Sequence, residues 1–175
     1  MNVFAKVALV TSSLLAIALF SSNSFATGTE LGLVLGRSTK SQEADVVRFT
    51  YRRLLSESSE WWMPSAIQLG ASIWRVPDLA GTTQRYDINA TPVWRLEKSW
   101  GYVEGGIGAY LLSKTINTDE YHLPSSFEFG SHIGVGMRVG ENGRIGVAFQ
   151  HLSNAGLKQP NGGINFIELT GSIQF

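Results

Sequence analysis

Apolar and polar residues alternate along much of this chain, in stretches of about ten positions. In the stretch 66–76, for example, Ile67, Leu69, Ala71 and Ile73 fall on one face. Alternation with a period of two is typical of β-strands. The pattern predicts eight strands, at residues 28–37, 44–55, 66–76, 84–97, 100–113, 125–139, 144–154 and 164–175.

The faces opposite the apolar positions carry charged residues. In the stretch 84–97, Asp87 and Arg95 alternate with Ile88 and Trp94. Such faces are too charged for the core of a water-soluble β-sandwich, whereas a membrane barrel has an apolar outside, a polar inside and no unpaired backbone edge in lipid. The sequence therefore predicts an all-β fold, an eight-stranded antiparallel transmembrane β-barrel of the outer membrane.

Inward-facing charged residues have a structural explanation in a barrel of this size. An eight-stranded barrel has a lumen that is filled by side chains. We therefore expect a polar plug inside the barrel, and neither a conducting pore nor a buried catalytic site. The expected plug residues are Arg48, Arg52, Asp87, Arg95, Glu104, Glu128 and Arg138.

The lengths of the connections predict the orientation of the barrel. Outer-membrane barrels have short periplasmic turns and longer outer loops. The tight connections are 98–99 and 140–143, and the segment 56–65 is long for a periplasmic turn. The longer segments, which we expect to face away from the cell, are 38–43, 77–83, 114–124 and 155–163.

The first 26 residues have the features of a secretory signal peptide. Lys6 precedes an apolar run at 7–20, and Ser24-Phe25-Ala26 provides a small-x-small cleavage site. The run is shorter than the roughly 20 residues that a membrane-spanning helix needs. We expect residues 1–26 to be removed and residues 27–175 to form one barrel domain.

Composition excludes several classes of function. The formal net charge is +0, which gives no electrostatic reason to expect a nucleic-acid partner, since such binding normally shows as a clustered basic surface. The chain has no cysteine, which removes disulfides and thiolate metal sites, and its 3 histidines lack convincing partner ligands. We therefore expect no metal site, and outer-membrane lipids as the surroundings.

One pair of residues in the seventh predicted strand suggests chemistry. His151 and Ser153 are two positions apart and so project from the same face, as a base and a nucleophile can. Parity puts them on the lipid-facing side with Val147 and Phe149. Polar side chains that face lipid need a reason. Either they form an active site, or the strand has left the hydrocarbon layer by residue 151.

The segment 151–161, with Gly163 and the last strand, resembles the lipid A 3-O-deacylases of the PagL type. Its sequence is His151-Leu152-Ser153-Asn154-Ala155-Gly156-Leu157-Lys158-Gln159-Pro160-Asn161. The resemblance implies an eight-stranded outer-membrane barrel that removes the ester-linked acyl chain at position 3 of lipid A without a metal or organic cofactor. It also implies an active site on the barrel exterior, facing the outer leaflet.

The resemblance also implies roles for particular residues. Ser153 is then the nucleophile and His151 the general base, and Asn154 and the backbone amide of Gly156 match the groups assigned to the oxyanion hole. The best-known form of the family has a Glu fourteen residues after the His, where this chain has Asn165.

Strand parity places Asn165 on the outward face and Glu168 on the lumen face. Glu168 is therefore a poor substitute for the family's Glu unless a bulge shifts the register. Asn165 can orient the imidazole through its side-chain oxygen, or it can simply end the loop that follows Gly162 and Gly163. Both interpretations of Asn165 remain open, and so does Glu168 as the third member of a triad.

Two other classes of function fit the same barrel. One is a non-enzymatic structural or adhesion protein whose loops bind partners, and the other is a lipid A acyltransferase. In the deacylase hypothesis the partner is lipid A or lipopolysaccharide, and Lys158 is a candidate contact for its phosphates. A second copy of the chain, in a homodimer, could equally cover the outward polar patch.

Overall fold

The computed structural model describes residues 28–40, 44–55, 62–78, 81–117 and 121–175. The predicted signal peptide lies outside the described residues, as does most of the segment 56–65. Within the described part, no helix is long and apolar enough to cross a membrane. The strands are β1 (Thr29–Ser38), β2 (Asp45–Leu54), β3 (Ala66–Asp78), β4 (Gly81–Glu97), β5 (Gly101–Leu112), β6 (Ile116–Asn117), β7 (His122–Leu123), β8 (Phe127–Val139), β9 (Gly143–Ser153) and β10 (Ile164–Gln174).

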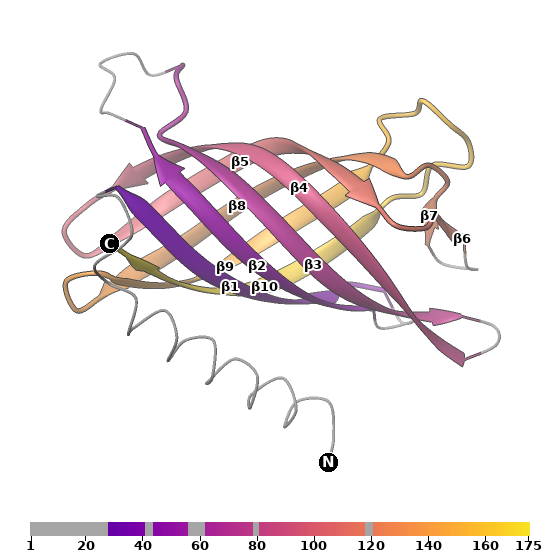
Figure 1. The fold of residues 1–175 in the computed structure, drawn as a ribbon, viewed down its shortest axis with the longest axis horizontal. Helices are drawn as coiled ribbons and strands as arrows, with labels where there is room; N and C mark the ends of the chain where they lie inside the picture. Colours follow the sequence, from indigo (N-terminus) through magenta and orange to yellow (C-terminus); the bar gives the residue numbers. More distant parts are fainter. Residues whose placement is uncertain (1–27, 41–43, 56–61, 79–80, 118–120) are drawn as a thin grey trace.

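Eight of these strands form one closed barrel (Figure 1). Their order around the barrel is β1-β10-β9-β8-β5-β4-β3-β2, and every neighbouring pair is antiparallel. The barrel closes because β1 pairs with both β2 and β10. The barrel strands have 10 to 17 residues, enough for the roughly 9–11 that a tilted strand needs to cross a bilayer. The predicted fold and its eight strands are confirmed.

The outside of the barrel is apolar. Leu69 on β3, Ile88 on β4, Ile133 on β8 and Leu169 on β10 are each at least half exposed, although all are large apolar side chains. Between them, successive residues point inward, as the pleat of a strand requires. In water such a surface would be unfavourable, but it is the surface that a membrane barrel presents to lipid.

Paired charges fill the part of the lumen nearer the carboxyl end of the chain. Glu30 lies 2.7 Å from Arg95 and 3.2 Å from Arg52. Glu104 also contacts both arginines, at 3.0 Å from Arg52 and 2.8 Å from Arg95. Because buried charges must be paired to be tolerated, these four residues hold the walls of the barrel together as one network. The predicted polar plug therefore exists.

Two residues expected in the plug differ from that prediction. The side chain of Arg138 is 38% exposed and lies 3.9 Å from Glu97, so it sits at the barrel mouth and not in the plug. Glu128 is fully buried, but its hydrogen bond is to Ser125 and not to a plug arginine. Strand parity gave the correct face for both residues and could not give their depth along the barrel axis.

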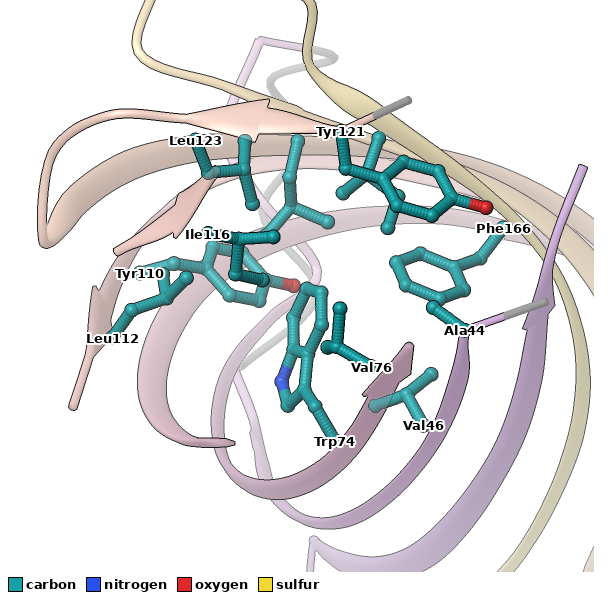
Figure 2. Close-up of a cluster of buried hydrophobic side chains, with 12 residues drawn as sticks. Ala44, Val46, Trp74, Val76, Tyr110, Leu112, Ile116, Tyr121, Leu123 and Phe166 are labelled. Carbon is teal, nitrogen blue, oxygen red and sulfur yellow. The ribbon is translucent and has the colours of Figure 1, made fainter. Parts of the chain in front are cut away.

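An apolar cluster closes the other end of the lumen, as Figure 2 shows. Trp74 on β3 and Phe166 on β10 are fully buried, and their rings meet edge to face with centroids 5.1 Å apart. Ile116 on β6, Leu123 on β7 and Tyr121, the residue before β7, lie over this pair (Figure 2). This small two-stranded sheet, within the predicted loop 114–124, acts as a lid on the barrel.

The connection between β3 and β4 is also more regular than the sequence predicted. Pairing continues past the expected strand ends to Pro77 with Thr82 and Asp78 with Gly81. The predicted loop 77–83 is thus mostly strand, and this prediction was wrong. The carboxyl end of the chain and the turn between β8 and β9 lie at the opposite end of the barrel (Figure 1).

Candidate active site

His151 and Asn165 are direct partners across β9 and β10. Both are only partly buried, on the outward face of the barrel. The Nδ1 atom of His151 lies 2.6 Å from the Oδ1 atom of Asn165. Since an amide oxygen carries no hydrogen, His151 donates its Nδ1–H to Asn165. In the neutral ring this leaves the lone pair on Nε2, which is the form a general base requires.

Ser153 lies two residues after His151, at the end of β9 and on the same face. Its Cα partner on β8 is Phe129. Leu152, which lies between His151 and Ser153 in the sequence, points into the buried cluster. Ser153 is partly exposed. In the described part of the chain no hydrogen bond joins Ser153 to His151, and catalytic hydrogen bonds in ligand-free enzymes often tighten only when substrate is bound. The pair therefore has the positions for nucleophile and base.

Asn154 organises the loop that follows Ser153. It is fully buried, and its Nδ2 atom donates to the carbonyl oxygen of Lys158 at 3.0 Å. Its Oδ1 atom accepts the backbone N–H of Gly156, also at 3.0 Å. The two groups expected to form an oxyanion hole are therefore adjacent to Ser153, and in this state they bond within the loop.

Glu168 lies on the other face of β10 from Asn165. Its side chain is buried in the lumen, where it accepts a hydrogen bond from Arg48 at 3.1 Å. The neighbours of Glu168 on its own strand, Ile167 and Leu169, point outward. There is no bulge in the pairing between β9 and β10, so the parity argument for the last strand is confirmed. Asn165, and not Glu168, contacts His151.

A feature that sequence analysis missed is an outward depression of about 440 Å³ beside His151. Ser131 is the Cα partner of His151 on β8, and it is one of the residues that line the depression. Ser131 is a polar position in the outward apolar series of β8, a signal that could have identified it. The remaining lining residues are Trp94, Gly105, Gly106, Ile107, His132, Ile133 and Phe149.

The described residues contain no group of three or more His, Asp or Glu side chains placed to hold a metal ion. Lys158, the candidate phosphate contact, is exposed on the loop after Ser153. The arrangement thus brings together a serine, a histidine with an amide partner and an apolar depression, all on the outside of the barrel. This combination suits acyl transfer from a lipid ester.

Comparisons with known proteins find one family. The family model described as lipid A 3-O-deacylase (PagL) matches residues 45–174. A lipid A deacylase PagL of Bordetella bronchiseptica is 38% identical over 111 residues, which cover 62% of this chain and 61% of that relative. A lipid A deacylase PagL of Pseudomonas aeruginosa is 33% identical over 132 residues, which cover 69% of this chain and 75% of that relative.

A solved structure gives the same result for the fold. The crystal structure of the outer membrane enzyme PagL superposes with a TM-score of 0.66 and 26% sequence identity. The match covers 83% of this chain and 99% of that one. The likeness therefore extends over the whole barrel and not only over the segment around His151.

Proposed function

The chain belongs to the lipid A 3-O-deacylase (PagL) family, and on that premise we propose that it is an outer-membrane serine esterase that hydrolyses the ester-linked 3-O-acyl chain of lipid A. One observation carries the mechanism. His151 is held by Asn165 in the tautomer of a general base, on the lipid side of the barrel and on the same face as Ser153.

The location of the site supports a lipid substrate. The face that bears His151 and Ser153 continues into the apolar band of Val147 and Phe149, so a lipid ester reaches the site by diffusion within the leaflet. The site lies at the same end of the barrel as the lid and the connection between β9 and β10, opposite the carboxyl end (Figure 1). Since long loops of such barrels face outward from the cell, we place the site in the outer leaflet.

In the proposed reaction, the Oγ atom of Ser153 attacks the ester carbonyl while Nε2 of His151 takes its proton. The tetrahedral intermediate breaks the bond between the acyl carbon and the sugar oxygen, and His151 returns the proton to that oxygen. Water then attacks the acyl-enzyme with His151 again as base, the bond between the acyl carbon and Oγ of Ser153 breaks, and His151 returns the proton to Oγ. The products are a free fatty acid and lipid A with a 3-hydroxyl group.

Charge on the attacked oxygen needs hydrogen-bond donors. We propose the backbone N–H of Gly156 and the side-chain amide of Asn154, both within three residues of Ser153. Each is a donor in the loop already, to Asn154 Oδ1 and to the Lys158 carbonyl respectively. Both donors therefore change partner when the ester binds.

The outward depression beside Ser131 supports an acyl substrate. Its lining includes Ile107, Ile133 and Phe149, so the depression is largely apolar. A chain whose ester lies at Ser153 can enter this depression without leaving an apolar environment. We propose that it receives the chain to be removed.

The test is hydrolysis of purified lipid A in detergent micelles prepared in ¹⁸O-labelled water. The proposal predicts lipid A that has lost one hydroxyacyl chain, and released fatty acid that carries one ¹⁸O atom. A non-enzymatic structural or adhesion barrel leaves lipid A unchanged. An acyltransferase changes the mass of an acceptor lipid and releases no labelled acid. Either of these results overturns the proposal.

A further inference from the structure

The edge of the His151 ring away from Asn165 lies against the main chain of Gly163. A Cβ atom built on Gly163 would lie 2.8 Å from Cε1 and 3.4 Å from Nε2 of His151. The same Cβ would lie 2.8 Å from the carbonyl oxygen of Leu152, which is backbone and cannot move aside. Only a residue without a side chain leaves the ring in its present place.

Gly163 also has a backbone conformation that favours glycine, with φ of 61°. It begins the approach to β10, two residues before Asn165. Since Leu152 pairs with Ile164, Gly163 lies at the level of Ser153 across the two strands. The ring of His151 therefore has Asn165 at its Nδ1 atom and Gly163 at its Cε1 atom.

The lid holds Gly163 in this place. Gly163 donates its backbone N–H to the carbonyl oxygen of His122 on β7, at 3.2 Å, and the two residues form an isolated antiparallel bridge. Leu123, which follows His122, and Ile116 on β6 are at most 1% exposed in the apolar cluster of Figure 2. The lid is thus packed into the barrel mouth, and its hydrogen bond from Gly163 to His122 ties Gly163 to this buried cluster.

We propose that Gly163, fixed by its bridge to β7, is a positioning residue that confines the imidazole of His151 to the orientation in which Nε2 serves Ser153. The inference rests on the proposed esterase function, because it assigns Gly163 and the lid a part in that reaction. Gly163 itself carries no reacting group. Its role is to remove freedom from the base, since a misplacement of about 1 Å can cost roughly 10²-fold in rate.

The test compares Gly163→Ala with a matched control, Gly140→Ala. Gly140 has φ of 64° in the turn between β8 and β9, and a Cβ there meets nothing within 4 Å. Both variants therefore place alanine in the same strained conformation, but only one adds an atom next to His151. We expect Gly163→Ala to lower kcat about 10- to 100-fold with KM within about 3-fold, and Gly140→Ala to keep the wild-type kcat.

A spectroscopic measurement separates positioning from mere loss of structure. In ¹⁵N-histidine-labelled protein in micelles, we expect wild-type and Gly140→Ala protein to show His151 with hydrogen on Nδ1. In Gly163→Ala we expect the Nδ1–H signature to be lost or averaged with the other tautomer. This readout needs no substrate, so it tests the inference even if lipid A is not hydrolysed and the proposed function fails.

A second variant tests the lid itself. Leu123→Ala changes no residue of the proposed active site, but it weakens the packing of β7 in the barrel mouth and so the position of Gly163. We therefore expect kcat to fall, while heat-modifiable gel migration shows that the barrel is still folded. Wild-type kcat and an unchanged His151 signal in both Gly163→Ala and Leu123→Ala would overturn the inference. Equal losses in Gly163→Ala and Gly140→Ala would also overturn it, since backbone strain alone would then explain them.

Discussion

His151 donates its Nδ1–H to the side-chain oxygen of Asn165, its direct partner on the neighbouring strand, at 2.6 Å. The bond fixes the tautomer of the imidazole, but an amide, unlike a carboxylate, brings no charge to stabilise the imidazolium that forms in the reaction. Asn165 can therefore orient the imidazole of His151, whereas a carboxylate in its place would both orient the ring and stabilise its positive charge. The consequences can be measured by changing Asn165.

Asn165→Ala should reduce deacylation only in part, because the base itself remains while its orientation is lost. General base catalysis as a whole is worth about 10²- to 10⁴-fold, which sets the upper bound for the loss. Asn165→Glu should keep an acceptor for the Nδ1–H of His151 and add a negative charge that stabilises the imidazolium. Its rate should match or exceed that of wild type if the new carboxyl is ionised. Initial rates on lipid A micelles at one pH provide the comparison.

Glu168→Gln is the matched control on the same strand. Glu168 faces the lumen and bonds to Arg48, so its loss should lower the stability of the barrel and leave kcat close to wild type. If Glu168→Gln loses activity while Asn165→Ala keeps it, Asn165 does not complete the site and the register of β10 in the active enzyme differs from the one described.

Asn154 offers a second test, of the proposed oxyanion hole. Asn154→Ala removes a proposed donor and also the acceptor that orients the N–H of Gly156. Loss of one such donor costs about 10²- to 10³-fold in kcat, so a drop of at least that size is expected, with little change in KM. Rates within 3-fold of wild type, in a variant that still migrates as a folded barrel, would exclude Asn154 from the oxyanion hole.

The strands and their faces could be predicted from the sequence because lipid outside and charge inside impose alternation on every membrane-crossing residue. This is why the parity argument placed Asn165 outward and Glu168 inward correctly. Outside the hydrocarbon layer nothing enforces that alternation. The extension of the β3–β4 hairpin through Pro77 and Thr82 was therefore missed, as was the lid formed by β6 and β7.

The site was predictable where it depends on one strand and not where it depends on contacts between segments. His151 and Ser153 lie two apart in one strand, so their common face follows from local geometry. The contact with Asn165 required the register between two strands, which the resemblance to a known family provided. Gly163 and Ser131 lie near His151 in space but belong to other segments of the chain. A contact between a glycine and a ring cannot be recognised from the pattern of apolar and polar residues.

The lumen network yields a prediction about stability. Glu104→Ala leaves Arg52 and Arg95 with one shared carboxylate, that of Glu30. Removing one partner of a buried ion pair costs about 3–5 kcal/mol, so the urea midpoint of unfolding from micelles should fall markedly. Activity at low temperature should persist, because the network does not reach the outward face.

The control for that prediction is an exposed ion pair. Arg37 and Asp45 lie 2.9 Å apart with side chains 47% and 33% exposed. Pairs of this kind contribute about 0–1 kcal/mol. Asp45→Asn should therefore shift the urea midpoint far less than Glu104→Ala does, and equal shifts would show that the lumen network has no special role.

Chelation tests the expectation that no metal takes part. With a serine, a histidine and backbone or amide donors as the proposed machinery, purified protein should deacylate lipid A equally well with and without EDTA. Loss of activity in EDTA, recovered on addition of calcium, would instead require a metal-assisted mechanism with carboxylate ligands from the loops.

The most direct test of the account is the mass spectrum of lipid A after incubation with folded Ser153→Ala protein, alongside wild type. In the described part of the chain the side chain of Ser153 makes no hydrogen bond that holds the barrel, so the variant should fold and show heat-modifiable migration. The account predicts that wild-type protein removes one hydroxyacyl chain and that Ser153→Ala leaves lipid A intact. Removal of that chain by folded Ser153→Ala protein at the wild-type rate would contradict it.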